Sequence, residues 1–265
     1  MGNAPNQRGG SYLYCVTWSQ PFSGGSTFQA NGIAGQPARV VTQGDLAAIV
    51  SDSPTDQYDI TLANVRAHEA VIEEAMRRAD VLPVSFGTVA DSDQSVQRRL
   101  LQSQAGELRT QLQHVAGRVE MGVKVLWEQS ALFAQIAAND PHIQELGGQI
   151  AGTTAEETYD TRVELGELTD QAIQAQREQD AQAILDTLSP LAVDTRTNNI
   201  ISDMMIVNAA FLVEKGQQQA FTQKVNQLEQ ANTGKLIIQQ AGPLPPYNFV
   251  SVVVHWEEPS GAVAQ

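Results

Sequence analysis

The sequence has few positive charges. Its 265 residues include 16 lysines and arginines against 30 aspartates and glutamates, which gives a formal net charge of -14. A charge of this sign repels the phosphate backbone of nucleic acids and the anionic surface of membranes. The chain also lacks any run of about 18 consecutive apolar residues, the length that a membrane-spanning helix needs. We therefore expect a protein that binds neither nucleic acid nor membrane.

Cysteine is nearly absent as well. Cys15 is the single cysteine and lies in an apolar run, which is typical of a small buried hydrophobic side chain. It has no partner for an internal disulfide. The first ten residues are polar and rich in glycine, proline and asparagine, unlike the basic and then apolar pattern of a signal peptide. These features favour a reducing, cytoplasmic location.

Motifs for catalysis, metal binding and phosphate binding are missing too. The histidines show neither HxxxH nor HExxH spacing, and GxGxxG and GxSxG do not occur. The segment Gly147–Thr153 has two glycines at P-loop spacing, but Thr153 stands where a lysine is required. The histidines are His68, His114, His142 and His255. His68 falls on the apolar side of a predicted helix, where a packed core residue is the favoured role. We therefore expect no enzyme, no cofactor and no metal.

Strands and helices alternate in the predicted first half. Runs of β-branched and aromatic residues indicate strands, and apolar residues at three- and four-residue steps indicate helices. The glycine-rich segment Ser19–Pro37 is expected to be a mobile loop, and Gly44 is expected to supply the positive φ of a hairpin. The expected strands are Tyr12–Trp18, Ala38–Val41, Leu46–Val50, Val81–Phe86 and Met121–Trp127, and the expected helices run from Asp59 or Thr61 to Ala79 and from Asp91 to Val119.

The second half begins with helices. A short helix at Ala131–Ala138 breaks at Asp140–Pro141, and Gly147–Gly148 is expected to end the next segment. A polar helical pattern from about Thr154 to Leu188 would extend about 50 Å, so part of the resulting hairpin is expected to protrude. The remaining predicted elements are the strands Ala192–Thr197, Met204–Val213, Lys235–Gln239 and Phe249–Trp256 and the helix Gln217–Ala231.

This order of elements predicts an α+β fold in two domains. We expect one domain over residues 11–120 and a second over residues 121–258, with flexible tails at 1–10 and 259–265. Both halves end in an apolar strand followed by Trp-Glu, at Gly122–Gln129 and Ser251–Glu258. Whether the halves are duplicated β-α-β units remains open.

Acidic residues concentrate in the predicted helical hairpin. The stretch Asp140–Asp194 contains 12 acidic residues and only two basic ones, Arg162 and Arg177. Such a surface either keeps the protein soluble or docks a partner, and the charge pattern allows both readings. Glycine also occurs at position 166 inside the helical pattern, where it costs about 1 kcal/mol relative to alanine. We interpret Gly166 as a point of close approach, either by the protein's own sheet or by a partner.

Two further segments are unusually specific, and together with the rest of the chain they carry a family resemblance. Gly242–Val250 places three prolines and a Tyr-Asn pair before a predicted strand, and Val81–Val89 contains Gly87 at a turn. The order of motifs along the chain resembles the gas vesicle accessory family GvpF/GvpL. The motifs are YLYCVTW, GxxARVVTQGDLAAIVSD, HEAVIEEA, VLPVSFGTV, EMGVKVLW, RVELGELTDQAI and GPLPPYNFV. Two positions depart from the family pattern, because Leu244 stands where relatives often have tryptophan and Ser85 where many have arginine.

The resemblance implies a non-enzymatic protein of gas vesicle assembly whose N-terminal domain is similar to a modified ferredoxin-like fold. It implies partners, namely the hydrophobic main shell protein and other accessory proteins, and a location at the gas vesicle. On that basis we expect binding of the shell protein during nucleation and a place as a minor component of the shell. The expected contact residues are Glu156, Glu157, Glu164 and Glu167 of the hairpin, with Pro245, Pro246 and Tyr247.

Two alternatives remain open from the sequence. One is a small-molecule enzyme or sensor built on tandem ferredoxin-like units, with haem or flavin held by His68 or His255. The other is a general adaptor or chaperone for different client proteins. A colourless purified protein would count against the first, and a pull-down from lysate would separate the second.

Overall fold

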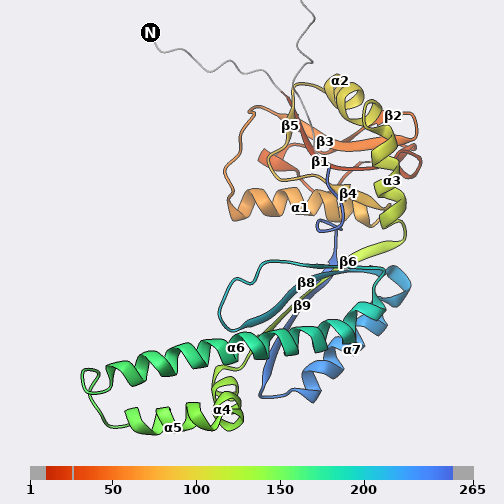
Figure 1. The fold of residues 1–265 in the computed structure, drawn as a ribbon. Coiled ribbons are helices and arrows are strands. Elements are labelled where there is room, and N and C mark those ends of the chain that lie inside the picture. The colour runs from red at the N-terminus through yellow and green to blue at the C-terminus, as the bar shows by residue number, and fades with distance from the viewer. Residues whose placement is uncertain (1–9, 26, 253–265) are drawn as a thin grey trace, which may run out of the picture. The chain divides into compact units, whose positions relative to one another are not determined.

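The computed structural model describes residues 10–25 and 27–252 (Figure 1). Helices and strands are mixed, as the sequence predicts. The described chain forms two compact units. Unit 1 contains the residues up to Glu120 and those from Pro243 onward, and unit 2 is Met121–Gly242. Among the described residues, no helix is both long and apolar enough to cross a membrane.

Unit 1 is built on an antiparallel sheet with the strand order β2-β3-β1-β4, in which β5 also pairs with β1. The residues of β1 are almost fully buried, which fits its place inside the sheet. Gly44 has φ +61° between β2 and β3, so the predicted hairpin is confirmed. The strands are β1 Gly10–Trp18, β2 Arg39–Gln43, β3 Leu46–Ser53, β4 Val81–Pro83 and β5 Val89–Ala90.

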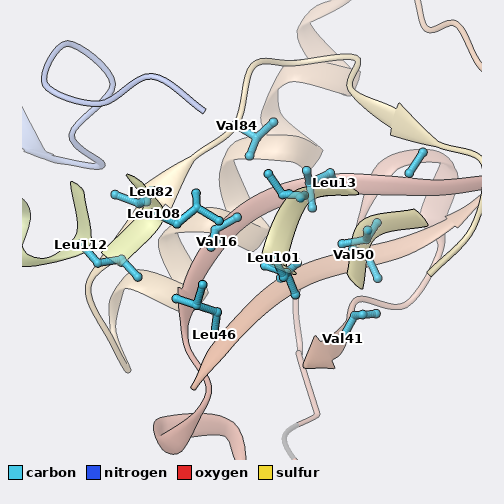
Figure 2. Close-up of a cluster of buried hydrophobic side chains, with 14 of the residues drawn as sticks. Leu13, Val16, Val41, Leu46, Val50, Leu82, Val84, Leu101, Leu108 and Leu112 are labelled. Atoms are coloured by element: carbon cyan, nitrogen blue, oxygen red, sulfur yellow. The ribbon is translucent and has the colours of Figure 1, made fainter. Parts of the chain in front are cut away.

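Helices cover both faces of this sheet. Helix α1 (Leu62–Met76) is capped by Thr61, whose side chain accepts from the N–H of Asn64. It packs on the cluster that contains Tyr12, Tyr14 and Cys15. The opposite cluster, which includes Leu13 and Val16, is covered by the segment that follows β5 (Figure 2). That segment contains α2 Asp93–Ser95, a π-helical stretch Val96–Gln102 and α3 Ala105–Val115.

The ferredoxin-like description of unit 1 is not confirmed. Three strands precede the first helix here, whereas the ferredoxin-like order is β-α-β-β-α-β. The helices after β3 and after β5 also pack on different apolar clusters, on the two faces of the sheet. The prediction of an α+β fold is confirmed, because helices and strands are both present.

The segment between β1 and β2 differs from the mobile loop that the glycines predict. It forms two 3-10 turns, Gln20–Phe22 and Ile33–Gly35, and buries Phe22 and Ile33. The N–H of Ile33 donates to the Tyr14 hydroxyl at 2.7 Å. Glycine content indicated turns correctly, but it did not reveal that apolar side chains fasten the segment to the core.

Unit 2 contains the second sheet, with the order β7-β8-β6-β9. The almost fully apolar strand β8 lies inside this sheet, as predicted from its composition. Its helices also follow the prediction, except that Gly147–Gly148 lies within α5 and does not end it. The strands are β6 Arg118–Trp127, β7 Asp194–Thr197, β8 Met205–Glu214 and β9 Leu236–Leu244, and the helices are α4 Gln129–Asn139, α5 Pro141–Ile150, α6 Tyr159–Leu188 and α7 Gln218–Ala231.

The segment from Pro243 onward differs from the expected domain 121–258, because its described residues belong to unit 1. Val250 and Val252 pack against the apolar cluster of Figure 2. Residues 249–252 are not a strand, and the rest of the predicted strand Phe249–Trp256 lies outside the described residues. The expected tails, 1–10 and 259–265, also lie outside them, except for Gly10, which belongs to β1 and pairs with Ser53 of β3.

Candidate functional site

Helices α5 and α6 form the predicted hairpin within unit 2. The 30 residues of α6 correspond to about 45 Å, and Figure 1 shows its N-terminal half, with α5 alongside, extending past strands β8 and β9. Asp140 caps α5 by accepting from the N–H groups of His142 and Ile143. Arg162 donates to the carbonyls of Ile150 and Thr153 and so holds the connection between the helices. We call residues 141–170 the hairpin arm.

The four glutamates predicted as contacts differ in their surroundings. Glu157 accepts from the N–H of Thr154 at 3.1 Å, and this hydrogen bond lowers the pKa of its carboxyl. Glu164 lies 3.1 Å from Nε2 of His142. Glu156 and Glu167 are exposed and have no hydrogen bond or ion pair with any described residue. Of the four predicted glutamates, Glu156 and Glu167 are therefore the two that a partner could reach without breaking an internal bond.

The C-terminal half of α6 is fixed to its own sheet by a polar cluster that the sequence did not reveal. The indole N–H of Trp127 donates to Asp180 at 2.7 Å. Arg177 lies over the Trp127 ring, 5.5 Å from its centroid, and donates to the carbonyls of Asp203 and Met205. In the sequence, this cluster could have been suspected from the three-residue spacing of Arg177 and Asp180, which puts both on one side of a helix. This cluster anchors one end of α6 and leaves the hairpin arm to project.

The Pro-rich turn is held inside unit 1 by a buried carboxylate. Glu120 accepts from the backbone N–H of Asn248 at 2.8 Å and from its side-chain amide at 2.6 Å. Burial raises the pKa of Glu120, and the two bonds from Asn248 oppose that rise. Pro245 and Pro246 are buried, whereas Tyr247 is 39% exposed. The two prolines therefore position the turn. Of the three predicted contact residues in this turn, Tyr247 is the one that is exposed to solvent.

The two motif segments singled out by the sequence meet at one cleft of unit 1. Residues of the Val81–Val89 segment and of the Gly242–Val250 segment line a cavity of about 530 Å³. Ser85 and Tyr247 are among the lining residues. The structure thus brings the Pro-rich turn next to the turn after β4, although the two segments are far apart in the sequence.

His68 is a core residue and not a ligand. Its Nε2 lies 3.2 Å from the carbonyl of Val84, and its Nδ1 lies 3.0 Å from the hydroxyl of Tyr12, which also accepts from the N–H of Gly87. Burial lowers the pKa of His68 to about 4, against the opposing bond to Val84. Because both ring nitrogens bond within the protein, His68 presents no free nitrogen to ligate a haem iron. His255, the other histidine considered for that role, lies outside the described residues.

Within the part of the chain that the structure describes, no group of three or more histidine, cysteine, aspartate or glutamate side chains is arranged to hold a metal ion. Cys15 is fully buried, and burial raises the pKa of its thiol. The described residues form an α+β protein of two compact units.

The comparisons with known proteins identify the family. The model of the family described as gas vesicle synthesis protein GvpL/GvpF matches residues 10–251, so the chain belongs to this gas vesicle protein family. A gas vesicle protein F from a Streptomyces species is 32% identical over 242 residues, covering 91% of this chain and 99% of the relative. A gas vesicle protein L from Streptomyces is 28% identical over 268 residues, covering 94% and 97%.

Solved structures give the same result. The crystal structure of GvpF from Anabaena matches with a TM-score of 0.80 and 26% identity, covering 92% of this chain and 99% of that one. GvpF from Microcystis aeruginosa shares the fold, with a TM-score of 0.74 and 24% identity. Family membership gives this chain a role in gas vesicle assembly. Its relatives are named as gas vesicle proteins and not as enzymes.

Proposed function

We propose that this protein binds the main shell protein of gas vesicles during nucleation, in the cytoplasm, and uses the hairpin arm as the contact. The observation that carries the proposal is the charge of residues 156–170, which include six acidic side chains and one basic one, Arg162. Arg162 is already bonded to the carbonyls of Ile150 and Thr153. The hairpin arm therefore offers a partner uncompensated negative charge.

A physical need supports this function. A shell subunit with an apolar face toward gas would aggregate in water, and a large exposed apolar patch is an aggregation hazard. An acidic protein that covers part of the subunit would keep it dispersed, and charge complementarity would speed their encounter. We also propose that the protein stays in the shell as a minor component and contacts other accessory proteins.

Tyr247 is proposed as a second contact. It is partly exposed beside the cleft of unit 1, and its turn is held by Asn248 on Glu120. An aromatic side chain on a rigid turn loses little conformational entropy on binding and buries a large area. Tyr247→Ser is expected to reduce shell-protein capture, and circular dichroism verifies that the variant is folded.

Co-purification tests the main contact. Tagged wild type and Glu156→Lys/Glu167→Lys are each expressed with the shell protein, and the captured shell protein is quantified. The matched control is Glu178→Lys/Glu229→Lys, which reverses two exposed glutamates outside the hairpin arm. We expect capture to fall at least fivefold with the first pair and to stay unchanged with the control. Equal capture by all three proteins would remove the hairpin arm from the contact, and equal capture of unrelated proteins would favour a general adaptor.

A further inference from the structure

One side of α6 faces the sheet at its C-terminal end and faces solvent at its N-terminal end. Ile184 and Leu188 are buried, and Arg177, seven residues before Ile184, reaches the carbonyls of Asp203 and Met205. At 3.6 residues per turn, the same side passes back through Gly166, Val163 and Tyr159. The stripe that unit 2 uses to pack its long helix therefore continues onto the hairpin arm.

On the hairpin arm this stripe has no cover. Tyr159 is 68% exposed and Val163 is 44% exposed, four residues apart on one side of the helix. Helix α5 packs against α6, but the side chains it engages there include Arg162 and Glu164. The described chain leaves Tyr159 and Val163 in solvent although the same stripe is buried at Ile184 and Leu188.

Gly166 adds a gap beside these side chains. A Cβ built at Gly166 would meet no atom within 4 Å beyond the helix's own backbone, so of the two readings of Gly166, close approach by the protein's own sheet is wrong and close approach by a partner stays a prediction. A helix gives up about 1 kcal/mol by having glycine at an interior position. Without a Cβ, the backbone of a partner can approach the helix axis more closely there than over any other residue type.

The side chains around Tyr159, Val163 and Gly166 are mostly acidic, which indicates a partner surface with positive charge. Asp160, Glu164, Glu167 and Asp170 lie within the same three turns, and the one base among them, Arg162, is engaged with carbonyls of the α5–α6 connection. Residues 159–170 span about 17 Å, the length of three helical turns. A helix packs against another helix by fitting side-chain ridges into such gaps.

We propose that the face formed by Tyr159, Val163 and Gly166 docks an amphipathic α-helix of a partner protein, with an apolar stripe flanked by lysine or arginine. The apolar stripe would cover Tyr159 and Val163, and one turn would enter the gap at Gly166. The basic flanks would meet the surrounding carboxylates. This inference rests on the proposed function, because it gives the chemistry of the partner surface for the same hairpin arm.

The experiment uses the full chain and a fluorescein-labelled synthetic peptide of 18 residues, an amphipathic helix of leucine, alanine and lysine. A twin peptide has glutamate in place of every lysine. Fluorescence anisotropy measures binding to the wild type, to Tyr159→Ser/Val163→Asn and to Gly166→Leu. Ile237→Asn is the control, because Ile237 is 49% exposed on β9 of the same unit.

We expect the lysine peptide to bind the wild type and the control within twofold of each other. Both face variants are expected to bind it at least tenfold more weakly, and the glutamate peptide is expected not to bind. Gly166→Leu keeps a strong helix former in α6, and circular dichroism verifies that it folds. The proposal would be overturned if the wild type bound both peptides with the same affinity. It would also be overturned if the face variants bound the lysine peptide as tightly as the wild type does.

The same variants separate this inference from the proposed function. If Glu156→Lys/Glu167→Lys loses the shell protein while the face variants keep both shell protein and peptide, the proposed function stands and the docking face is refuted. If the face variants lose the peptide while no change in the hairpin arm affects shell-protein capture, the docking face stands and the proposed function is refuted.

Discussion

Glu74 provides a quantitative test of how unit 1 holds the segment before β2. Its side chain is nearly buried, and its carboxylate accepts from the N–H groups of Gln29 at 2.9 Å and Ala30 at 2.8 Å. Arg78, four residues later on the chain, donates to it at 2.9 Å. In addition to the buried Phe22 and Ile33, this carboxylate ties Gln29 and Ala30 of the segment to α1.

Glu74→Gln removes the charge and one of the two acceptor oxygens. A hydrogen bond to a charged group contributes about 1.5–3 kcal/mol, and an unsatisfied buried donor costs about 1–3 kcal/mol. We expect the variant to lose about 2–4 kcal/mol of local stability. Because about 1.4 kcal/mol is a factor of ten, the amides of Gln29 and Ala30 should exchange hydrogen roughly 30- to 1000-fold faster. Glu73→Gln, one residue away and exposed, is the control.

The same carboxylate fixes the pH dependence. Burial disfavours the charged form of Glu74, but the N–H groups of Ala30 and Gln29, followed by Arg78 and Arg77, outweigh it and lower its pKa. A carboxyl with a lowered folded-state pKa stabilises the protein above its unfolded pKa, and this contribution is lost as the pH falls through the folded value. The difference between wild type and Glu74→Gln should therefore be full at pH 7 and shrink below about pH 4.5. A variant as protected as the wild type at pH 7 would refute this reasoning.

Three further changes have defined outcomes. Gly166→Ala should raise the stability of α6 by about 1 kcal/mol, because a Cβ there meets open space, and a lower melting temperature would contradict this. Asn248→Ala removes the side-chain amide donor to Glu120 and leaves the backbone N–H, so amide exchange in residues 245–252 should accelerate about tenfold, which mass spectrometry can measure. His68→Phe should make the free energy of unfolding depend less on pH in the acidic range. The pKa of His68 is lowered to about 4 in the folded state, so the free energy of unfolding of the wild type declines as the pH drops from about 6.5 to 4. Urea unfolding at pH 7 and pH 4.5 compares the two slopes.

The elements with strong periodic patterns were predictable from sequence. The nearly apolar composition of β8 placed it inside its sheet, and the steps of α1 placed Ile72 on its buried side, although Leu62 of the same pattern is exposed. Gly147–Gly148 was wrong as a helix end, because the Asp140 cap and the burial of Ile143 and Leu146 keep α5 helical through both glycines. Tertiary packing outweighs a cost of about 1 kcal/mol per glycine.

The long-range contacts had no local signature. The pairing of Trp127 with Asp180 joins residues 53 positions apart, and the bond from Asn248 to Glu120 joins residues 128 apart. Neither pair forms a motif of fixed spacing. For the candidate site, the sequence located the acidic stretch, but it could not distinguish Glu157, which caps a turn, from Glu167, which is free to meet a partner.

The fastening of residues 245–252 onto unit 1 has a consequence for how the molecule is made. A ribosome synthesises all of unit 2 before it reaches these residues, so the first unit to emerge is the last to be completed. Until then the nascent chain lacks Val250 and Val252 on its apolar cluster and carries Glu120 without Asn248. The described contacts of unit 1 are thereby complete only in chains whose translation has passed residue 252.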